Sequence, residues 1–511
     1  MRTQNTIKNI YISLASQIII IILGFISRKI FINSLGTEYL GLNGLLTNIL
    51  SMLSLVEGGM GASIVYNLYK PLAEDDRPTI IALTQLYKKI YGFLAIAVFV
   101  LGGLLYPFLE HLMKDQQSIP FLGIIYFIFI IKNVISYLNA HKWSLINADQ
   151  KGYILASYNL IFNVFTTVMK IIILMLTSDY ILYLLIELFI FIIQTIWNGY
   201  IVNKFYPYIS SKEKYVVNTH IKANIFTNVK SIFLHKIGTY FVFGTDNLLI
   251  SAYINTNTVG LYSNYTLILT NMQTLLNQVS LGIDASIGNL IATEGEEKTY
   301  KVYKIFYLIN FWLYSMSTIF LYNIVEPFIN VWFGEGLLLS HGTFIIILIN
   351  FYLTGMRNPI NIFKEKSGIF APDRYMPLIE AIVNLIVSII LVKKMGIMGI
   401  FLGTTISTLV IPFWTQPKIV FEKVFGVSLF EYFKSYLYYI FIALSVGYFS
   451  SYVNNYIPYN GFLLVICRSI VSLVICNLCY FLIFFRTDEF KYLFNVGRIL
   501  LKSKINLKVF G

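Results

Sequence analysis

Positively charged side chains interrupt several of the most apolar stretches of this chain. Lys132 and Lys170 lie deep within such stretches, and Arg28, Lys236 and Arg357 lie nearer the ends of others. A cation at the bilayer centre costs about 2.5–3.5 kcal/mol even on insertion scales, so it normally faces a polar cavity or a partner. Arginine matches phosphate oxygens with a rigid fork, and lysine supplies a point charge. The five cations therefore predict a cavity for a phosphate-bearing ligand, unless Arg28, Lys236 and Arg357 simply reach lipid headgroups.

Uncharged polar residues continue the same stretches at helical spacing. In a packed membrane bundle, Ser, Thr and Asn also join helices by hydrogen bonds, which is the alternative explanation for each of them. Because cations continue the stripes, we favour a water-filled cavity. The expected cavity residues are Asn159, Asn163, Thr270, Gln273, Asn277 and Asn361.

Carboxylates also occur at membrane depth, and they admit two interpretations. Such a group either pairs with a cation or takes up a proton as burial penalises its charge. Glu57, Asp246 and Asp284 are the candidates for coupling to H⁺ or Na⁺, while Glu187 and Glu380 are further carboxylates available for pairing.

Motifs for covalent or metal chemistry are absent from the sequence. It has no GxxxxGK[ST] phosphate loop, no HExxH pair, only 5 His and only 3 Cys. Cys476 and Cys479 form a single CxxC without a second pair, which is not enough for a zinc or redox site. We expect neither an enzyme nor a bound cofactor.

Composition indicates a membrane protein. Of 511 residues, 57% are hydrophobic and only 12% charged, against roughly 25% charged in soluble proteins. The net charge of +13 could suggest nucleic acid. However, Lys and Arg concentrate in the connections on the N-terminal side of the bilayer, which is the positive-inside bias. We therefore expect no nucleic-acid partner and a multi-pass protein of the bacterial plasma membrane with both termini cytoplasmic.

Apolar runs long enough to span a bilayer number about fourteen. The first is longer than a signal peptide, lacks a cleavage site and is expected to be retained. The runs are 10–33, 40–69, 90–109, 120–141, 153–176, 180–203, 231–252, 258–291, 305–325, 342–363, 375–393, 396–417, 435–453 and 459–485.

An internal repeat divides these runs into halves. Gly41-Leu42 opens a segment that reaches Ala-Ser-Ile at 62–64, and Gly260-Leu261 opens one that reaches Ala-Ser-Ile at 285–287. Such repeats are typical of transporters, with substrate held between the halves. The offset equals six helices, so the halves should share one orientation. We predict an N-lobe over 1–204, a cytoplasmic linker over 205–230, a C-lobe over 231–417, two added helices over 418–485 and a basic tail over 486–511.

Four segments carry a resemblance to a known family. They are RKIFINSLGTEYLGLNGLL, LSLVEGGMGASIVYNLYKPL, FGTDNLLISAYINTNTVGLYSNY, and GMRNPINIFKEKSGIFAPDRYMPLIEAIVNLIVSIILVKKMGIMGIFLGTTIST. The order and spacing of these segments resemble those of the Wzx-type polysaccharide flippases of the multidrug/oligosaccharidyl-lipid/polysaccharide (MOP) superfamily.

The resemblance implies an all-α fold in which two six-helix, MATE-like lobes enclose a cationic cavity beside two further C-terminal helices. It implies alternating access that moves undecaprenyl-diphosphate-linked oligosaccharide to the outer leaflet. Arg28 and the region of Lys236 fall where related flippases have cavity cations. Membrane lipids, glycosyltransferases and a polysaccharide polymerase are the further partners that it implies.

Three rival functions fit parts of the sequence. A flippase for lipid II or for a teichoic-acid intermediate would share the fold. A multidrug antiporter would usually have twelve helices and an acidic cavity for its cationic drugs. A membrane polymerase or ligase would need a large outer loop bearing catalytic residues, and the longest outer loops here, around 109–119 and 326–341, are short.

Overall fold

The computed structural model describes most of the chain, and every regular element in the described part is a helix. The described residues are 2–58, 60–109, 112–113, 119–149, 151–211, 213, 215, 217, 225, 240, 244–369 and 372–495. Side chains are described for these residues except 2–16, 62, 279–286, 288–289 and 292.

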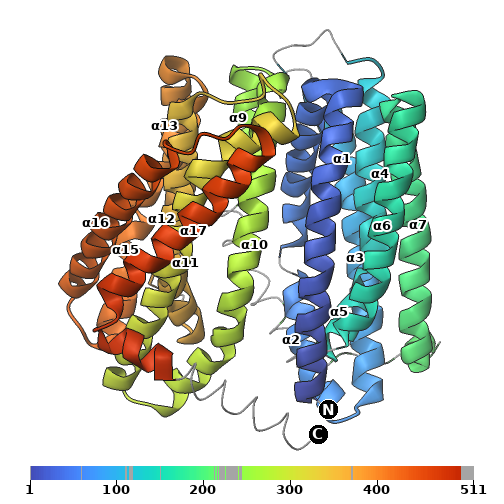
Figure 1. Ribbon diagram of the computed structural model, residues 1–511. Helices are drawn as coiled ribbons and strands as arrows, with labels where there is room; N and C mark the ends of the chain where they lie inside the picture. Colours follow the sequence, from blue (N-terminus) through green and yellow to red (C-terminus); the bar gives the residue numbers. More distant parts are fainter. Residues whose placement is uncertain are drawn as a thin grey trace, which may run out of the picture. The chain divides into compact units, whose positions relative to one another are not determined.

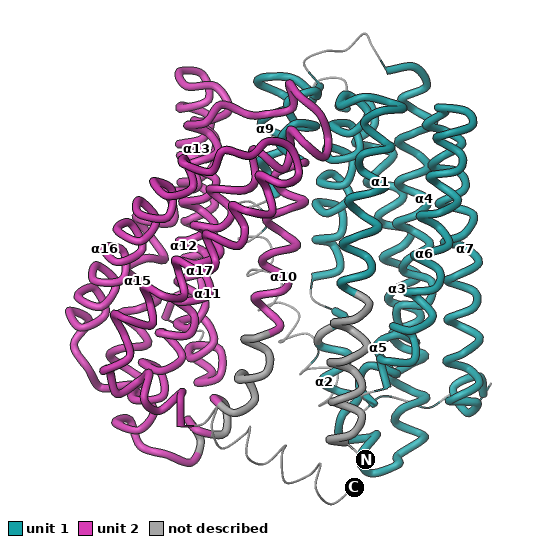
Figure 2. Tube along the Cα trace, viewed as in Figure 1, with its two compact units in different colours: residues 1–263 teal, residues 264–511 magenta. Residues whose placement is uncertain are grey.

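The chain forms two compact units, Met1–Ser263 and Asn264–Gly511 (Figure 2). The predicted lobe boundaries stay a prediction, because a compact unit need not coincide with a lobe. Unit 1 contains α1 (Arg2–Leu53), η1 (Ser54–Glu57), α2 (Met60–Ala73), α3 (Arg77–Leu105), η2 (Tyr106–Phe108), α4 (Leu122–Leu138), α5 (Ala140–Ala148), α6 (Gly152–Thr177), α7 (Tyr180–Phe205), η4 (Pro207–Ser210), α9 (Asp246–Tyr253) and the start of α10 (Thr256–Thr293) (Figure 1).

Unit 2 contains the rest of α10 and the helices that follow it (Figure 1). These are α11 (Glu296–Trp332), α12 (His341–Lys366), α13 (Met376–Met395), α14 (Ile397–Val410), α15 (Pro412–Val420), η5 (Phe421–Phe425), α16 (Leu429–Asn454) and α17 (Gly461–Phe484).

Short polar side chains explain where two of the long helices begin. The Asp76 carboxylate accepts a hydrogen bond from the backbone N–H of Thr79 at 3.1 Å and starts α3. The Asp179 carboxylate accepts from the N–H groups of Ile181 and Leu182 at 2.7 and 3.1 Å and starts α7. Each cap satisfies backbone donors that a first helical turn leaves without partners.

Glycine residues lie at two interruptions of the N-terminal helices. Gly36 has φ 82° and ψ −179° within α1, between the predicted runs 10–33 and 40–69. Gly58 has φ 59° and ends η1, so the prediction of one continuous helix over 40–69 is wrong. Both conformations lie in the region that favours a residue without Cβ. Gly36 divides α1 into two stretches, and Gly58 separates the second stretch from α2.

Nine of the described helices are long and apolar enough to cross a membrane, and the α4–α5 pair, bent by 47°, would make a tenth. This set counts α1 once although Gly36 divides it, and it omits α10 and α12. The predicted polar stripes of α10 and α12 lower their hydropathy. The predicted run 231–252 falls mainly on residues outside the description. The helices are those of a multi-pass membrane protein.

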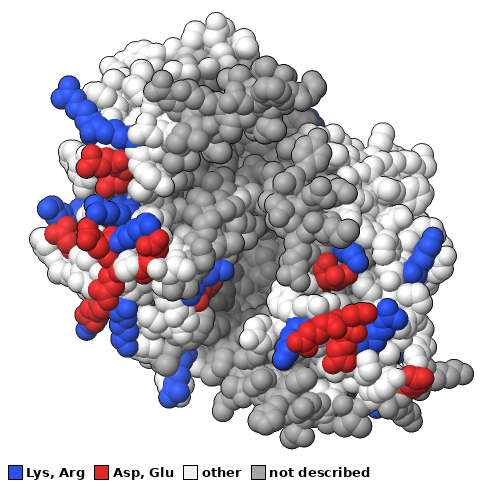
Figure 3. All heavy atoms as spheres, turned by 90° about the horizontal axis from the view of Figure 1, so that it is seen from below, with Lys and Arg blue, Asp and Glu red and all other residues white. Residues whose placement is uncertain are grey.

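Successive long helices within each unit run in alternating directions (Figure 1). In the view from below, basic and acidic side chains gather at that end of each unit (Figure 3). Several of these side chains form exposed ion pairs at the α2–α3 turn, at the α10–α11 turn and after α17. The pairs are Lys70–Glu74, Arg77–Asp75, Lys298–Glu294, Lys301–Glu297 and Lys491–Asp488.

The two glycines that open the sequence repeats contact each other inside unit 1. A Cβ on Gly41 would overlap the carbonyl oxygen of Thr256, and a Cβ on Gly260 would overlap that of Thr37. The Thr37 hydroxyl also donates to the Asn257 side chain. The contact is reciprocal, because each glycine packs on the threonine that lies four residues before the other glycine. This is the pattern of an isologous, two-fold interface.

We predict that Gly41→Ala destabilises the protein, because the added methyl group would force α1 and α10 apart at a backbone contact. Overpacking of this kind costs about 1–3 kcal/mol, and thermal unfolding in detergent should move to lower temperature. Gly24→Ala is the matched control in the same helix, since a Cβ there meets no atom within 4 Å. Equal melting temperatures for the two variants would contradict the close contact.

Candidate cation-lined site

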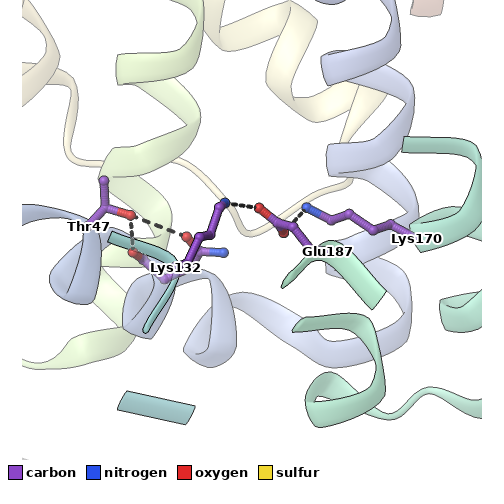
Figure 4. Close-up of polar contacts among 5 residues, drawn as sticks. Thr47, Lys132, Lys170 and Glu187 are labelled. Carbon is purple, nitrogen blue, oxygen red and sulfur yellow. Dashed lines mark hydrogen bonds and ion pairs between the residues drawn. The ribbon is translucent and has the colours of Figure 1, made fainter. Parts of the chain in front are cut away.

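Two of the predicted cations share one carboxylate in unit 1. The ammonium groups of Lys132 on α4 and Lys170 on α6 each form an ion pair with Glu187 on α7, one with each carboxylate oxygen. Figure 4 shows them approaching Glu187 from opposite sides. The expectation that a carboxylate at membrane depth pairs with a cation is confirmed at Glu187.

Aromatic rings and a third cation extend this group. The Lys170 ammonium lies 4.2 Å from the centre of the Tyr183 ring, and that of Lys132 lies 5.7 Å from the Phe191 ring. Tyr183 is also within electrostatic range of Arg28 on α1. The Arg28 guanidinium donates a hydrogen bond to the hydroxyl of Ser263 at 2.8 Å. Arg28, Lys132, Lys170 and Glu187 are called the cationic cluster below.

The cationic cluster retains a positive charge. Three cations and one carboxylate leave two positive charges uncompensated among the side chains of the cluster. The side chain of Lys132 is 36% exposed, against 16% for Lys170 and 19% for Glu187. Of these three side chains, Lys132 is therefore the one that a ligand reaches most readily, while Lys170 and Glu187 are more deeply buried.

The predicted stripe on α6 divides between two environments. The Asn159 side-chain oxygen accepts hydrogen bonds from Gln194 and Asn198 on α7, both at 2.8 Å. Asn159 thus joins two helices, which was the alternative explanation for this residue. Asn163 is exposed.

Arg357 belongs to unit 2 and pairs there with a single carboxylate. Its Nη1 lies 3.6 Å from Oε1 of Glu380 on α13, and the same oxygen accepts a hydrogen bond from Thr408 at 3.4 Å. Both ionic side chains are largely buried, at 14% and 9% exposed. Glu380 balances the charge of Arg357, so this pair adds no net charge. Nε and Nη1 of Arg357 nevertheless lack hydrogen-bond acceptors within the described part of the chain.

The remaining stripe residues lie on two helices of unit 2. On α10, Thr270 and Asn277 are exposed and Gln273 is half-buried. The Asn277 side-chain oxygen accepts a hydrogen bond from the Tyr314 hydroxyl at 3.3 Å. Asn361 is half-buried on α12. The function of these four residues as cavity walls stays a prediction.

The candidate coupling carboxylates occupy different settings. Glu57 ends η1 and accepts from the N–H of Gly61 at 3.2 Å. Asp246 is the first residue of α9, is 8% exposed, and its Oδ1 accepts no hydrogen bond from the described residues. Asp284 lies on α10, but its side chain is outside the description, as is the whole of Lys236.

One buried ion pair, Lys364–Asp373, was not predicted from the sequence. Lys364 near the end of α12 pairs with Asp373 in the following turn, and their side chains are only 6% and 1% exposed. The pair closes the connection between α12 and α13. A separation of nine residues across a turn has no periodic signal, so the sequence offers no pattern from which to predict it.

Solved structures with the same arrangement define the class of the protein. The chain is similar to "Lipid II flippase MurJ, inward closed conformation", with 16% identity and a TM-score of 0.64 over 93% of this chain and 99% of that one. An inward-facing multidrug resistance MATE family transporter of the MOP superfamily has 11% identity and a TM-score of 0.56 over 78% and 95%. A point mutant of the Vibrio cholerae MATE transporter VcmN has 11% and 0.57 over 80% and 94%. The fold is that of the MOP-type membrane transporters.

A family model described as "Polysaccharide biosynthesis protein" matches residues 6–280. The chain belongs to this family, which contains the Wzx-type polysaccharide flippases, and the resemblance seen in the sequence is confirmed. No curated protein sequence matches the chain significantly. The protein is a membrane transporter of the flippase type rather than an enzyme, and its family implies lipid-linked substrates within the membrane.

We predict that Glu187→Gln lowers thermal stability, because Lys132 and Lys170 would then face each other without a carboxylate. Lys170→Met combined with Glu187→Gln should recover part of the loss, giving a coupling free energy of about 1–3 kcal/mol in a double-mutant cycle. The exposed Lys394→Met is the control for removing a lysine charge. Strictly additive effects of Lys170→Met and Glu187→Gln would show that the two groups do not interact.

Proposed function

We propose that this protein carries undecaprenyl-diphosphate-linked oligosaccharide repeat units from the inner to the outer leaflet of the bacterial plasma membrane by alternating access, for surface or capsular polysaccharide synthesis. The diphosphate is the part of the substrate that the cationic cluster would hold. The polyprenyl tail can remain in the bilayer throughout, so that only the polar head needs a protein environment.

The observation that carries this proposal is the uncompensated charge of the cationic cluster. Lys132 and Lys170 share the single charge of Glu187, which leaves one positive charge there, and Arg28 adds a second within the cluster. A diphosphate carries about two negative charges and can accept charge-assisted hydrogen bonds from both arginine and lysine. A cationic drug, the ligand expected of a multidrug antiporter, would instead be repelled.

The positions of the basic residues support one orientation in the membrane. In each unit, basic residues occupy the end seen from below, where acidic residues also lie (Figure 3), and short cytoplasmic loops carry an excess of Lys and Arg. We therefore propose that this end faces the cytoplasm, with the N-terminus of α1 on the same side. The basic residues concerned are Lys70, Arg77, Lys151, Lys204, Lys298, Lys301, Lys366, Arg374, Lys423 and Lys491.

In this orientation the membrane potential favours export. Moving one charge across 100 mV is worth about 2.3 kcal/mol, so a dianionic head gains about 4.6 kcal/mol on moving outward from a negative interior. Asp246 is the residue that we propose for additional H⁺ or Na⁺ coupling, because one oxygen of its buried carboxylate accepts no hydrogen bond from the described part of the chain and a buried charge requires compensation.

Arg28→Ala is expected to slow flipping of undecaprenyl-diphosphate-linked glycan in proteoliposomes about tenfold or more, because a charge-assisted hydrogen bond is worth about 1.5–3 kcal/mol. Arg28→Lys should restore part of the rate. The exposed Lys89→Met should leave flipping unchanged and controls for net charge. Normal flipping by Arg28→Ala would remove the diphosphate-binding role of the cluster.

Deletion of the gene should cause a glycan repeat unit on undecaprenyl diphosphate to accumulate on the cytoplasmic side, as measured by mass spectrometry of extracted lipids. Accumulation of lipid II or of a teichoic-acid intermediate would assign the protein to the rival substrates instead. If no lipid-linked sugar accumulates, the flippase proposal is wrong.

Asp246→Asn should abolish any acceleration of flipping by a pH or sodium gradient while leaving the response to membrane potential intact, because the two effects act on different charges. The measurement compares proteoliposomes with each gradient imposed separately. A variant that still responds to the same ion gradient as the wild type would exclude Asp246 as the coupling group.

A further inference from the structure

A pocket of about 700 Å³ opens in unit 1 and is separate from the cationic cluster. Its walls come from η1, α2, α3, α4 and α5, and none of its described lining residues is a lysine or an arginine. The described lining residues are Glu57, Gly61, Val65, Tyr66, Tyr69, Tyr91, Ser136, Tyr137, Ala140, Trp143, Ser144 and Asn147. The volume lies within the range of about 300–1,000 Å³ that is usual for small-molecule sites.

The pocket adjoins the cationic cluster along α4. Ser136 lines the pocket and Lys132 belongs to the cluster, so the two lie four residues apart on one helix. Residues at this spacing share a helix face and differ by about 6 Å along the axis. Lys132 therefore lies about one helical turn from the pocket wall, a separation that one ligand can span.

The lining combines flat aromatic rings with hydrogen-bonding groups. Tyr91 and Tyr137 are buried and stack on each other behind the pocket wall, with ring centres 6.0 Å apart and planes inclined by 28°, and the half-buried Trp143 adds a large ring to the lining. Such rings present an apolar face beside a polar tip. Sugars have the complementary surface, with C–H groups on the faces of the ring and hydroxyls around its edge.

Hydrogen-bonding capacity in the pocket remains unused. Glu57 accepts from the Tyr91 hydroxyl at 3.4 Å and from Gly61 at 3.2 Å, both through Oε1. A carboxylate has acceptor sites on both oxygens, so Glu57 can take further hydroxyl donors. The side chain of Asn147 adds an amide with both donor and acceptor groups.

We infer that this pocket is a sugar-binding subsite for the residue attached directly to the diphosphate, an inference that rests on the proposed function. Glu57 and Asn147 hydrogen-bond the hydroxyl or acetamido groups of this sugar, and the Trp143 ring, backed by the stacked Tyr91 and Tyr137, packs against its ring. The charge of Glu57 makes the subsite selective for neutral sugars over uronic acids, since like charges in a confined site repel each other.

The test compares two probes that differ by one sugar, undecaprenyl diphosphate and undecaprenyl-diphosphate-N-acetylglucosamine, binding to the full chain in a sugar-free detergent. The wild type should bind the sugar-bearing lipid about tenfold more tightly, as expected for one or two additional hydrogen bonds. Trp143→Ala should reduce this ratio to about one while keeping the affinity for undecaprenyl diphosphate. Arg28→Ala should weaken both probes alike.

Matched variants separate the subsite from general damage. Trp197→Ala removes an exposed tryptophan of α7 that does not line the pocket and should leave the ratio unchanged. Glu57→Gln keeps the size of the side chain and should also lower the ratio, so the subsite remains testable if Trp143→Ala fails to fold. An unchanged ratio in Glu57→Gln and in folded Trp143→Ala would overturn the subsite.

Failure of the subsite and failure of the proposed function give different results. If wild-type protein binds and flips both probes equally, the flippase function stands and the sugar subsite is wrong. If it neither binds nor flips either probe, the proposed function is wrong and the subsite falls with it.

Discussion

Compensation of charge at membrane depth is the constraint on which the rest of the proposed site depends. At an effective dielectric of 20, two charges 4 Å apart interact by about 4 kcal/mol, so Lys132 and Lys170 tolerate each other only because Glu187 lies between them. The same carboxylate holds α4, α6 and α7 in register. Glu187 contacts two cations but neutralises only one positive charge. The remaining positive charge can attract an anion.

The fold was largely predictable because apolar length and glycine position are local properties. The gap between runs 10–33 and 40–69 corresponds to the break at Gly36, and most other runs coincide with observed helices. The break at Gly58 was not predicted, because a glycine within an apolar stretch is compatible with both a continuous and an interrupted helix.

The candidate site was predictable only in part. Helical spacing identified Lys132 and Lys170, and the cost of burying them required a partner, but three-dimensional contact was needed to show that both use Glu187. Arg357 was predicted in the same way and proves to be balanced by Glu380. Tyr91 and Trp143 line the adjoining pocket from separate helices, and scattered aromatic residues in an apolar chain resemble ordinary packing.

The crossing of α1 and α10 has a consequence for the origin of the chain. A residue that touches its own repeat counterpart, as Gly41 touches Gly260, must lie close to a rotation axis. In a half-length ancestor, the same glycine would have met its copy in a second polypeptide, so this contact has the geometry of a homodimer interface. Gene fusion would then have preserved an interface that already existed between two separate chains.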